Sequence, residues 1–594
     1  MRHTFTKSPC SAASWMPWRQ ALVLLGVWVL MLPAAGQELR LEVRPVAQGQ
    51  ALRLNEALDA QTPARVSRLD FLLSGLALRK KDGGWLESKD WFAYLSAASG
   101  RMTAQGTGTP AGEYTGIRFR IGVDEAVNKA DPHRHAPDHA LNPQVNGLHW
   151  GWMGGYIFMA LEGRFQNGGK EDGFSYHIAN APQLMTVELP VEFRGGRPLT
   201  LALELDVTRI LTGIDFAKDG TSTHSREGDP LAAKLKANIE QAFRVREVNY
   251  DVYQTPAFAA KPAPAPAGTH PLTPAITQRF PQVHLPADNP LTEEGVALGR
   301  QLFHDTRLSI NGTQSCASCH DQKNAFADPR RFSLGAQQQA GKRNAMPLFN
   351  LAWHQGFFWD GRAATLREQV LMPIQDKNEM NETLPNVIAK LNANPECKTA
   401  FAKAFGSPEI TAERMAKALE QFLLTFISQE SRFDRAARKV AELNESEKRG
   451  LQLFVTEFDP KRGLRGADCF HCHGGTLFTS QSFANNGLEL AADDLGRMAV
   501  TKDAADRGKF KTPSLRNIAR TAPYMHDGRF ATLEEVVEHY SGGVRRSPTL
   551  DPNLAKHPEA GIQLNAQEKA DLVAFLHTLT DESFTGPESA TAAR

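Results

Sequence analysis

The first part of the chain alternates apolar and polar residues with the two-residue period of a β-strand. Residues 199–207 place Leu or Val at every second position, and residues 117–123 place Ile, Phe or Val in the same way. This alternation is typical of strands with one buried face. Residues 69–78 and 156–165 are two further predicted strands. The pattern predicts an all-β, sandwich-like domain, mostly antiparallel, over residues 37–255.

The second part of the chain changes to a helical period. Residues 572–579 place apolar side chains at i, i+3, i+4 and i+7, after Asn565 as the predicted N-cap and Glu568 three positions later. Residues 415–426 carry a second apolar stripe. We therefore expect two mainly α-helical domains, over residues 275–443 and 444–594, with the division near Asn444, where a new helix is predicted to begin.

A segment rich in Pro and Ala separates the two parts. Six prolines lie between Thr255 and Pro274, and this composition favours an extended, semi-rigid tether. Residues 256–274 are therefore predicted to be a linker.

The N-terminus has the pattern of a secretory signal. Basic residues precede an apolar run over residues 21–32, and Pro33-Ala34-Ala35-Gly36 resembles a cleavage site. The run is shorter than the roughly 20 residues that span a bilayer, and no later segment is apolar enough to anchor the protein. We expect residues 1–36 to be a signal peptide and the mature protein to be periplasmic. The 67 basic and 66 acidic residues give no indication of nucleic-acid binding.

Two Cys-x-x-Cys-His pentads carry the strongest chemical signal. They are Cys316-Ala317-Ser318-Cys319-His320 and Cys469-Phe470-His471-Cys472-His473. Two thiols followed at once by an imidazole suit covalent attachment of haem c and ligation of its iron. A zinc site of four cysteines leaves the adjacent histidines unexplained, and thioredoxin-like pairs lack a surrounding βαβ pattern. Of the other cysteines, Cys10 lies in the predicted signal and Cys397 is expected in the core.

Residues 290–580 resemble the bacterial diheme cytochrome c peroxidases, and more closely the MauG-type enzymes. The resemblance rests on both pentads and on three further strings: Phe357-Phe358-Trp359-Asp360-Gly361-Arg362, Phe510-Lys511-Thr512-Pro513-Ser514-Leu515-Arg516-Asn517 and Pro523-Tyr524-Met525-His526-Asp527-Gly528. It implies two haem c groups, with His320 and His473 as proximal ligands of the iron.

The resemblance also implies roles for residues between the pentads. Trp359 occupies the position of a tryptophan between the two haems, where an indole divides a long electron transfer into two shorter steps; an ordinary packed tryptophan is the alternative. Gln369, Pro373 and Glu379 match the distal pocket of the first haem, where a carboxylate can move a proton between the peroxide oxygens. A solvent-exposed Glu379 is the alternative.

The sixth iron ligands distinguish the subfamilies. Peroxidases that depend on external donors carry a histidine before the tryptophan string, whereas residues 333–341 contain none. The first iron is therefore predicted to be five-coordinate and open to peroxide. Tyr540 stands where MauG-type enzymes carry a tyrosine ligand, and a phenolate lowers the potential of the iron. Met498 or Met525 as the ligand would reverse this interpretation.

The family also binds calcium between the haems through an asparagine side chain and backbone carbonyls. Asn344 and the segment from Thr512 to Ser514 match those positions. Oxygen donors suit a hard cation such as Ca²⁺.

The β domain resembles the MbnP-type copper-binding domains in the string from Asn142 to Tyr156. Their MauG-type partners oxidise a tryptophan of the copper protein to kynurenine, so the resemblance implies a fusion of enzyme and protein substrate. Imidazole and thioether donors suit copper. The candidate copper ligands are His139, His149 and His177, with Met153 a weaker one. His133 and His135 are equally consistent with a solvated loop, and five histidines can also be ordinary surface polarity.

The target indole is left open between Trp85, Trp91, Trp150 and Trp152; Trp85 and Trp91 are favoured as exposed. Three functions are compatible with the sequence. The first is hydrogen-peroxide-dependent oxidation of a tryptophan in the N-terminal domain, of the same chain or of a second copy. The second is detoxification of peroxide with electrons from a small cytochrome or copper protein. The third is a copper carrier or sensor whose haems only transfer electrons.

Overall fold

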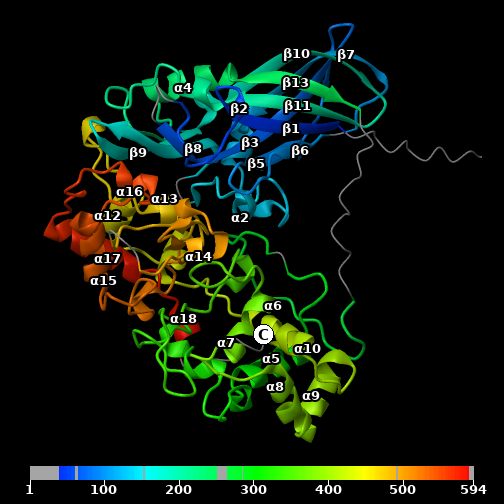
Figure 1. Ribbon diagram of the computed structural model, residues 1–594, viewed down its shortest axis with the longest axis vertical. Coiled ribbons are helices and arrows are strands. Elements are labelled where there is room, and N and C mark those ends of the chain that lie inside the picture. Colours follow the sequence, from blue (N-terminus) through cyan, green and yellow to red (C-terminus); the bar gives the residue numbers. More distant parts are fainter. Residues whose placement is uncertain are drawn as a thin grey trace, which may run out of the picture.

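The computed structural model describes residues 39–59, 64–106, 108–151, 154–250, 264–283, 285–489 and 493–586. The predicted signal peptide, Trp152, Met153 and the first part of the predicted linker lie outside these residues. The β domain occupies one end of the molecule and two helical regions follow below it (Figure 1). In the part of the chain that is described, no helix combines the length and the apolar character that crossing a membrane requires.

Two sheets form the N-terminal domain, as the alternating pattern predicts. The smaller sheet contains β1 (Leu39–Ala47), β2 (Gln50–Ala51), β6 (Thr103–Gln105), β11 (Leu199–Asp206) and β13 (Phe243–Asn249). The larger sheet contains β3 (Ala64–Lys80), β4 (Trp85–Glu87), β5 (Phe92–Ser96), β7 (Gly112–Ile121), β8 (Ile157–Asn167), β9 (Lys170–Ala179), β10 (Met185–Gly195) and β12 (Ser222–Thr223). Only the β1–β11 and β9–β12 pairs among these strands are parallel.

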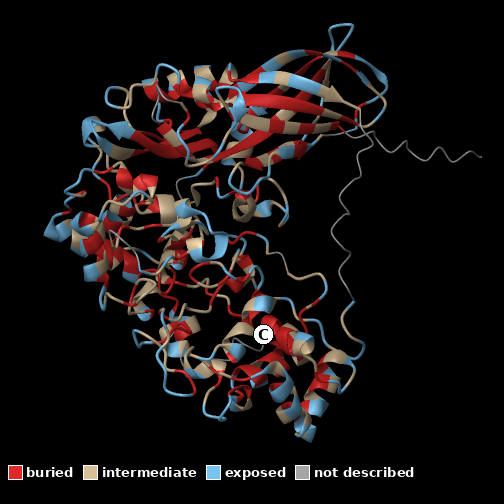
Figure 2. Ribbon diagram, in the orientation of Figure 1, coloured by how far each residue is buried: buried red, intermediate tan, exposed pale blue. Residues whose placement is uncertain are grey.

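The core of this domain lies between the sheets. Phe243 of the smaller sheet meets Phe119 and Phe71 of the larger sheet edge to face, with ring centroids 5.4 and 6.4 Å apart. Figure 2 shows two kinds of strand. Buried and more exposed residues alternate along β10, with the period expected for one buried face, whereas β8 and β11 are buried along most of their length. The short helices of this domain are α1 (Glu125–Lys129), α2 (Pro143–Asn146), α3 (Val207–Ile210) and α4 (Pro230–Glu240).

The first helical region is built on the crossing of two helices. It contains α5 (Glu293–Phe303), α6 (Leu366–Gln369), α7 (Met372–Gln375), α8 (Leu384–Asn392), α9 (Pro395–Phe405), α10 (Ala412–Leu424) and α11 (Arg432–Ala437). The predicted stripe of residues 415–426 is buried here. A Cβ atom on Gly299 of α5 would lie 2.0 Å from the carbonyl oxygen of Ala418 on α10, so only glycine permits this close approach.

The second helical region begins at a capped helix. It contains α12 (Glu445–Phe454), α13 (Phe470–His473), α14 (Met498–Thr501), α15 (Leu533–Glu538), α16 (Pro552–Ala555), α17 (Ala566–His577) and α18 (Glu582–Thr585), with the short strands β14 (Phe483–Ala484) and β15 (Phe510–Lys511). Asn444 caps α12, and Asn565 caps α17 with Glu568 in a capping box. Both predicted helix starts are confirmed.

The end of the predicted linker lies against the first helical region. The backbone N–H of Leu272 donates to the carbonyl oxygen of Leu291 over 2.9 Å, and His270 contacts Glu294 over 2.6 Å. Residues 270–272 are therefore held beside the start of α5 and do not form a free tether.

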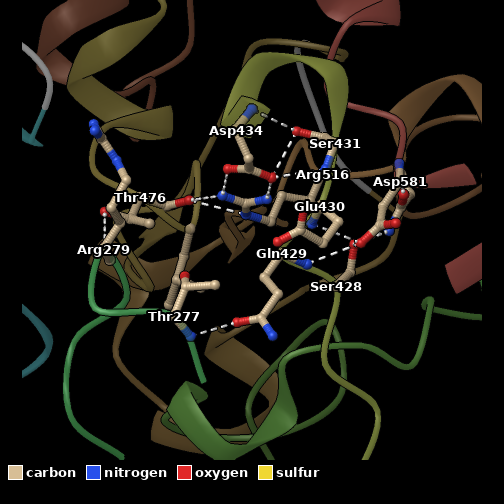
Figure 3. A network of polar contacts seen from close by, with 12 residues as sticks. Thr277, Arg279, Ser428, Gln429, Glu430, Ser431, Asp434, Thr476, Arg516 and Asp581 are labelled. Carbon is tan, nitrogen blue, oxygen red and sulfur yellow. Dashed lines mark hydrogen bonds and ion pairs between the residues drawn. The ribbon is translucent and has the colours of Figure 1, made fainter. Parts of the chain in front are cut away.

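The last described helix, α18, packs against the first helical region. Phe584 of α18 packs on Phe326 and Phe426, and its carbonyl oxygen accepts a hydrogen bond from Gln322. Figure 3 shows how Asp581 accepts hydrogen bonds from the backbone of Gln429 and neighbouring residues. The two helical regions are thus joined through the segment that follows α10.

Candidate functional site

The first pentad lies on a short 3₁₀ turn, η5 (Cys316–Ser318). Neither of its cysteines forms a disulfide in the described part of the chain. The Nδ1 atom of His320 lies 2.7 Å from the carbonyl oxygen of Phe326, and burial lowers the pKa of the imidazole. This contact fixes Nδ1–H as the donor and leaves Nε2 as the metal-binding atom, the arrangement found in ligating histidines.

The second pentad has the same arrangement on α13. The Nδ1 atom of His473 lies 3.3 Å from the carbonyl oxygen of Phe478 and 3.2 Å from that of Pro513. Burial lowers the pKa of His473 to about 4, so the imidazole is neutral and its Nε2 lone pair is available. Among the described residues, the groups of three close metal-ligating side chains include no cysteine. The geometry therefore fits two haem c groups and gives no support to a four-cysteine zinc site.

Glu379 lies close to the first pentad. Burial raises the pKa of Glu379 to about 7, and the charge of Asp376 adds to this shift. Burial also raises the pKa of Cys316 to about 12, and Glu379 contributes to that shift through its charge. Gln369 ends α6, and the carbonyl oxygen of Pro373 on α7 accepts a hydrogen bond from Met380. A carboxyl group with a pKa near neutrality can both accept and return a proton at physiological pH.

The loop of residues 333–341 packs directly on the Glu379 segment. The backbone N–H of Ala336 donates to the carbonyl oxygen of Glu379 over 2.7 Å, and a Cβ atom on Gly335 would lie 2.2 Å from the carbonyl oxygen of Asn378. The loop contains no histidine, so it offers no imidazole to the Glu379 segment on which it packs.

Trp359 lies in the first of the three strings that accompany the pentads. Hydrogen bonds connect it directly with the second string and, through Asn344, with the third. Its indole N–H donates to the carbonyl oxygen of Asn344 over 2.9 Å, and its own carbonyl oxygen accepts from the N–H of Lys511 over 2.7 Å. The N–H of Asn344 donates in turn to the carbonyl oxygen of His526. The side chain is 9% exposed. Backbone from both helical regions therefore holds the indole in one orientation.

Lys511 is a buried cation that sequence reasoning missed. Its Nζ atom donates to the carbonyl oxygens of Gln355 and Gly356, over 2.6 and 2.7 Å, and no carboxylate is among the partners described for it. Burial lowers its pKa to about 7. Nothing in the local pattern separates this lysine from an exposed one.

One of the predicted calcium donors, Asn344, contacts Trp359 through its carbonyl oxygen. The side-chain amide of Asn344 donates to the carbonyl oxygens of Arg330 and Arg331, which directs its Oδ1 atom away from them. The carbonyl oxygen of Thr512 accepts from Thr479, and the hydroxyl group of Ser514 donates to Leu477. Calcium binding at these oxygen atoms stays a prediction.

Tyr540 lies on a π-helical turn, His539–Gly543. The side-chain amide of Asn486 contacts the Tyr540 hydroxyl group over 3.2 Å and the Met525 Sδ atom over 3.3 Å. Burial raises the pKa of Tyr540, and the thiols of Cys472 and Cys469 add to that shift, so the phenol lies near the second pentad. The side-chain amide of Asn486 thus contacts both Tyr540 and Met525. The assignment of Tyr540 as the ligand of the second haem iron stays a prediction.

Comparison with known proteins agrees with this geometry. The family profile described as di-haem cytochrome c peroxidase (MauG) matches residues 293–442, and that described as MbnP matches residues 36–225. The methylamine utilization protein MauG of Methylorubrum extorquens is 40% identical over 301 residues, which cover 50% of this chain and 81% of that protein. The chain belongs to the MauG-type diheme cytochrome c peroxidase family.

Other known proteins are similar to parts of this diheme peroxidase. The cytochrome c peroxidase Ccp of Escherichia coli is 35% identical and covers 50% of this chain and 60% of that protein. The crystal structure of a MauG-like protein associated with microbial copper homeostasis is 39% identical over 52% of this chain and 95% of that chain, with a TM-score of 0.46. MbnP from Methylosinus trichosporium is 18% identical over 34% of this chain and 86% of its own, with a TM-score of 0.25. Because the relatives that share its diheme region are MauG and cytochrome c peroxidases, the protein is an oxidoreductase, and the MbnP profile match shows an N-terminal MbnP domain.

The predicted copper ligands of the MbnP domain do not form one group. His139 stacks on His135 with ring centroids 4.5 Å apart, and His149 packs against Tyr156 at 4.7 Å. Among the described residues, only His177 of the three belongs to a group of close metal-ligating side chains. Met153 lies outside the described residues.

The candidate tryptophans differ in what they contact. The indole N–H of Trp91 donates to the carbonyl oxygen of Gln105, and its side chain is buried, whereas the ring of Trp85 lies under Arg118. Trp150 packs against the core of the β domain and also against the core of the second helical region. Trp152 lies outside the described residues. Among the described candidates for the oxidised tryptophan, Trp150 is thus the one at the interface with the region of the second pentad. The sequence had favoured Trp85 and Trp91 as exposed targets.

Proposed function

We propose that this diheme peroxidase is exported to the periplasm and uses hydrogen peroxide to oxidise Trp150 of its own MbnP domain. The two haem c groups, when bound, supply the two-electron reduction of peroxide. The residues around them decide where peroxide binds, where the proton goes and which indole loses electrons. The position of Trp150 between the two domains is the observation that carries the proposal.

The contacts of Trp150 favour electron transfer within one chain. Its indole ring lies 5.7 Å from the ring of His224, which lies 5.4 Å from the ring of Phe470 inside the second pentad. Adjacent to it, the backbone of Gly151 meets that of Gly475, two residues after the pentad. An oxidisable side chain is therefore packed against the peptide segment that would carry the second haem.

The remaining predicted residues complete a route from this indole to peroxide. Trp359 lies between the helical regions and would pass electrons from the second haem to the first. Glu379 would accept the proton of bound peroxide from one oxygen and deliver it to the other. The loop of residues 333–341, which has no histidine, would offer no imidazole to the first haem iron, so that peroxide could bind there.

The reaction balances without a further oxidant. Loss of two electrons and two protons from the indole, with addition of one water oxygen, gives hydroxytryptophan, and the peroxide that accepts those electrons and protons becomes two waters. A second peroxide in the same sequence opens the indole ring to N-formylkynurenine. Hydrolysis then releases formate and leaves kynurenine.

We also propose that calcium binds at Asn344, Thr512 and Ser514. The bound ion would keep the two haems at a fixed separation. The oxygen donors suit this cation. The carbonyl oxygen of Asn344 accepts from the indole N–H of Trp359, and Thr512 follows Lys511, whose backbone N–H donates to the carbonyl oxygen of Trp359. Removal of calcium by a chelator is then expected to slow oxidation of Trp150 without releasing the covalently attached haems.

Peptide mapping by mass spectrometry tests the proposal. The full chain, with both haems attached, is treated with peroxide, and Trp150 is expected to gain one oxygen or to be converted to kynurenine. Trp150→Phe removes the modified peptide, whereas Trp85→Phe leaves it in place. An unmodified Trp150 after peroxide treatment would contradict the proposal. A rate per chain that does not change on dilution distinguishes oxidation within one chain from oxidation of a second copy.

The similarity to Ccp of E. coli favours a second candidate, a peroxidase with an external donor. This function predicts rapid peroxide turnover with a reduced small cytochrome or copper protein, and turnover that is unchanged in Trp150→Phe. A copper carrier whose haems only transfer electrons would retain its copper affinity in Glu379→Gln and Trp359→Phe and would oxidise no tryptophan in the unaltered protein.

A further inference from the structure

A guanidinium group binds the backbone that directly follows Trp359. The Nη1 atom of Arg497 donates to the carbonyl oxygens of Asp360 and Gly361 over 2.9 and 3.0 Å. A Cβ atom on Gly361 would lie 2.7 Å from this Nη1 atom and 2.4 Å from the ring of Phe483, so only glycine leaves room for the contact. No carboxylate is among the partners described for Arg497. Its positive charge is therefore held next to the indole without a neutralising group.

A second cation binds the backbone that precedes Trp359. Lys511 is 2% exposed, and its Nζ atom donates to the carbonyl oxygens of Gln355 and Gly356, again with no carboxylate among its described partners. Its own backbone N–H donates to the carbonyl oxygen of Trp359 over 2.7 Å. Arg497 and Lys511 thus hold the backbone on the two sides of the indole, and we call them the bracketing cations.

The carboxylate that follows Trp359 is already neutralised by other residues. Asp360 is paired with Arg343 over 2.6 Å and with Arg362 over 3.2 Å. Arg343 also binds both carboxylate oxygens of Asp494, over 2.7 and 2.8 Å. In this set of contacts two carboxylates are paired with two arginines. The bracketing cations therefore remain as an excess of positive charge around the indole.

The indole of Trp359 has no base to which it can lose its proton. Its N–H donates to the carbonyl oxygen of Asn344, and an amide carbonyl is too weak a base to remove that proton. Loss of an electron from Trp359 therefore leaves a cation. The side chain is 9% exposed, so water screens the neighbouring charges only weakly. Positive charge on both sides raises the free energy of the oxidised indole, because like charges repel more strongly where the dielectric constant is low.

We propose that the bracketing cations make Trp359 harder to oxidise, so that it passes electrons without keeping an oxidising equivalent itself. This inference rests on the proposed function. An electron that Trp359 gives up towards the first pentad is promptly replaced by one from the side of Trp150. The lasting loss of electrons, and the oxygen that is added, then fall on Trp150. Arg497 and Lys511 act through Trp359 and are therefore positioning residues.

Removal of one charge tests the proposal in the full chain with both haems attached. Arg497→Gln can still donate to the two carbonyl oxygens but has no charge, whereas Arg497→Lys keeps the charge. Both are treated with peroxide at pH 6, below the pKa of about 7 of Lys511. Electron paramagnetic resonance of rapidly frozen samples measures the tryptophan radical, and peptide mapping measures oxygen added to Trp359 and to Trp150.

The unaltered protein is expected to add oxygen at Trp150 and not at Trp359. In Arg497→Gln the radical and the oxygenated fraction of Trp359 should rise by at least about threefold, since one unit of neighbouring positive charge is lost. Arg497→Lys should behave as the unaltered protein does. The additional radical should disappear when Arg497→Gln is combined with Trp359→Phe, which assigns it to this indole.

Lys511→Gln gives a second, independent variant and should act in the same direction. Arg414→Gln, on α10, is the matched control. The guanidinium group of Arg414 also donates to two backbone carbonyls, those of Ser407 and Glu409, and lies over the ring of Phe405. It contacts no part of the Trp359 segment, so this variant should leave Trp359 unmodified.

Three results would overturn the proposal. They are an unchanged Trp359 radical in both Arg497→Gln and Lys511→Gln, an equal rise in Arg497→Lys, and oxygen added to Trp359 as readily as to Trp150 in the unaltered protein. A Trp150 that stays unmodified contradicts the proposed function instead. The radical at Trp359 still tests the role of the bracketing cations in that case, so the two failures are distinguishable.

Discussion

Gly151 of the MbnP domain approaches Gly475 so closely that a Cβ atom on Gly151 would lie 2.8 Å from the Cα atom of Gly475. The contact lies beside Trp150 and two residues beyond the second pentad. The absence of a side chain at Gly151 therefore sets how closely the MbnP domain can pack on the segment that would carry the second haem.

Gly151→Ala is expected to separate this interface and to slow oxidation of Trp150 by at least about tenfold, equivalent to 1.4 kcal/mol of activation free energy. Gly147→Ala is the matched control, because Gly147 has a φ of +58° against +59° at Gly151, but nothing lies within 4 Å of its Cβ position. Peptide mapping after peroxide treatment measures both. Equal rates in the two variants would show that the glycine contact does not position Trp150.

Trp359→Phe should slow oxidation of Trp150 by about tenfold or more, because phenylalanine does not give up an electron as readily as an indole. Trp353→Phe provides the control. Trp353 is also buried and its indole N–H also donates to a backbone carbonyl, that of Pro281, over 2.9 Å. Both variants thus lose one hydrogen bond of the same kind, and only the loss of a relay should change the rate. The measurement is the rate of peroxide consumption and of Trp150 modification in single-turnover experiments.

Glu379→Gln is expected to lower the rate of peroxide reduction by about 10²–10⁴-fold, the usual contribution of a general acid–base group. Since burial raises the pKa of Glu379 to about 7, the carboxylate form that accepts the proton increases as the pH rises through 7. The rate should rise over the same range in the unaltered protein and stay flat in Glu379→Gln. Asp376→Asn removes a charge that raises this pKa and should move the inflection to lower pH. An unmoved inflection would assign the pH dependence to another group.

Tyr540→Met should raise the reduction potential of the second haem, because a thioether ligand favours ferrous iron more than a phenolate does. Redox titration followed by absorbance measures the shift, and oxidation of Trp150 should become slower. Met525→Leu is the control, since Asn486 contacts both side chains. A potential that changes in Met525→Leu and not in Tyr540→Met would identify Met525 as the ligand.

Arg516→Met should destabilise the protein by about 3–5 kcal/mol, the cost of removing one partner of a buried ion pair. Arg516 is 1% exposed and binds both carboxylate oxygens of Asp434 over 2.8 Å, as Figure 3 shows. Arg516→Met combined with Asp434→Asn should recover part of that loss. Arg520→Met, which removes an exposed pair with Glu582, should cost about 0–1 kcal/mol. Urea unfolding followed by circular dichroism measures all three.

The same pair predicts a pH dependence of stability. Burial opposes ionisation of Asp434, but the charge and hydrogen bonds of Arg516 keep its pKa below the usual value. The folded state therefore binds fewer protons at this site than the unfolded state does. The ionised Asp434 therefore adds to the free energy of unfolding above pH about 3.9, the pKa of the unfolded state. This stabilisation is lost as the pH falls through the lower pKa of the folded state. The urea midpoint of unfolding is measured at a series of pH values from 6 downwards. It should fall less steeply with decreasing pH in Asp434→Asn than in the unaltered protein.

Much of the fold is encoded over short stretches of sequence. The alternation in residues 199–207 becomes β11 because side chains of a strand point to opposite faces. The Asn565–Glu568 spacing becomes a capping box because the helix itself brings those positions together. Each pentad is equally local, since one turn of chain presents its thiols and imidazole.

Features that depend on packing between distant segments have no such local signal. Lys511 is buried because the backbone at Gln355 and Gly356 folds over it. Arg516 is paired because α11 brings Asp434 to it from the preceding domain. Neither could be distinguished in the sequence from an exposed charged residue.

The sequence by itself determined a β domain followed by helical regions with two haem-attachment motifs, because haem attachment, helix starts and strand periods each depend on neighbours along the chain. The diheme peroxidase and MbnP assignments came from the resemblance of longer strings to known families. Only the tertiary structure placed Trp150 at the interface and brought His224 and His471 to His177. These residues meet because the β domain packs on the second pentad. That contact depends on the shapes of two folded surfaces, which cannot be read from the spacing of residues along the chain.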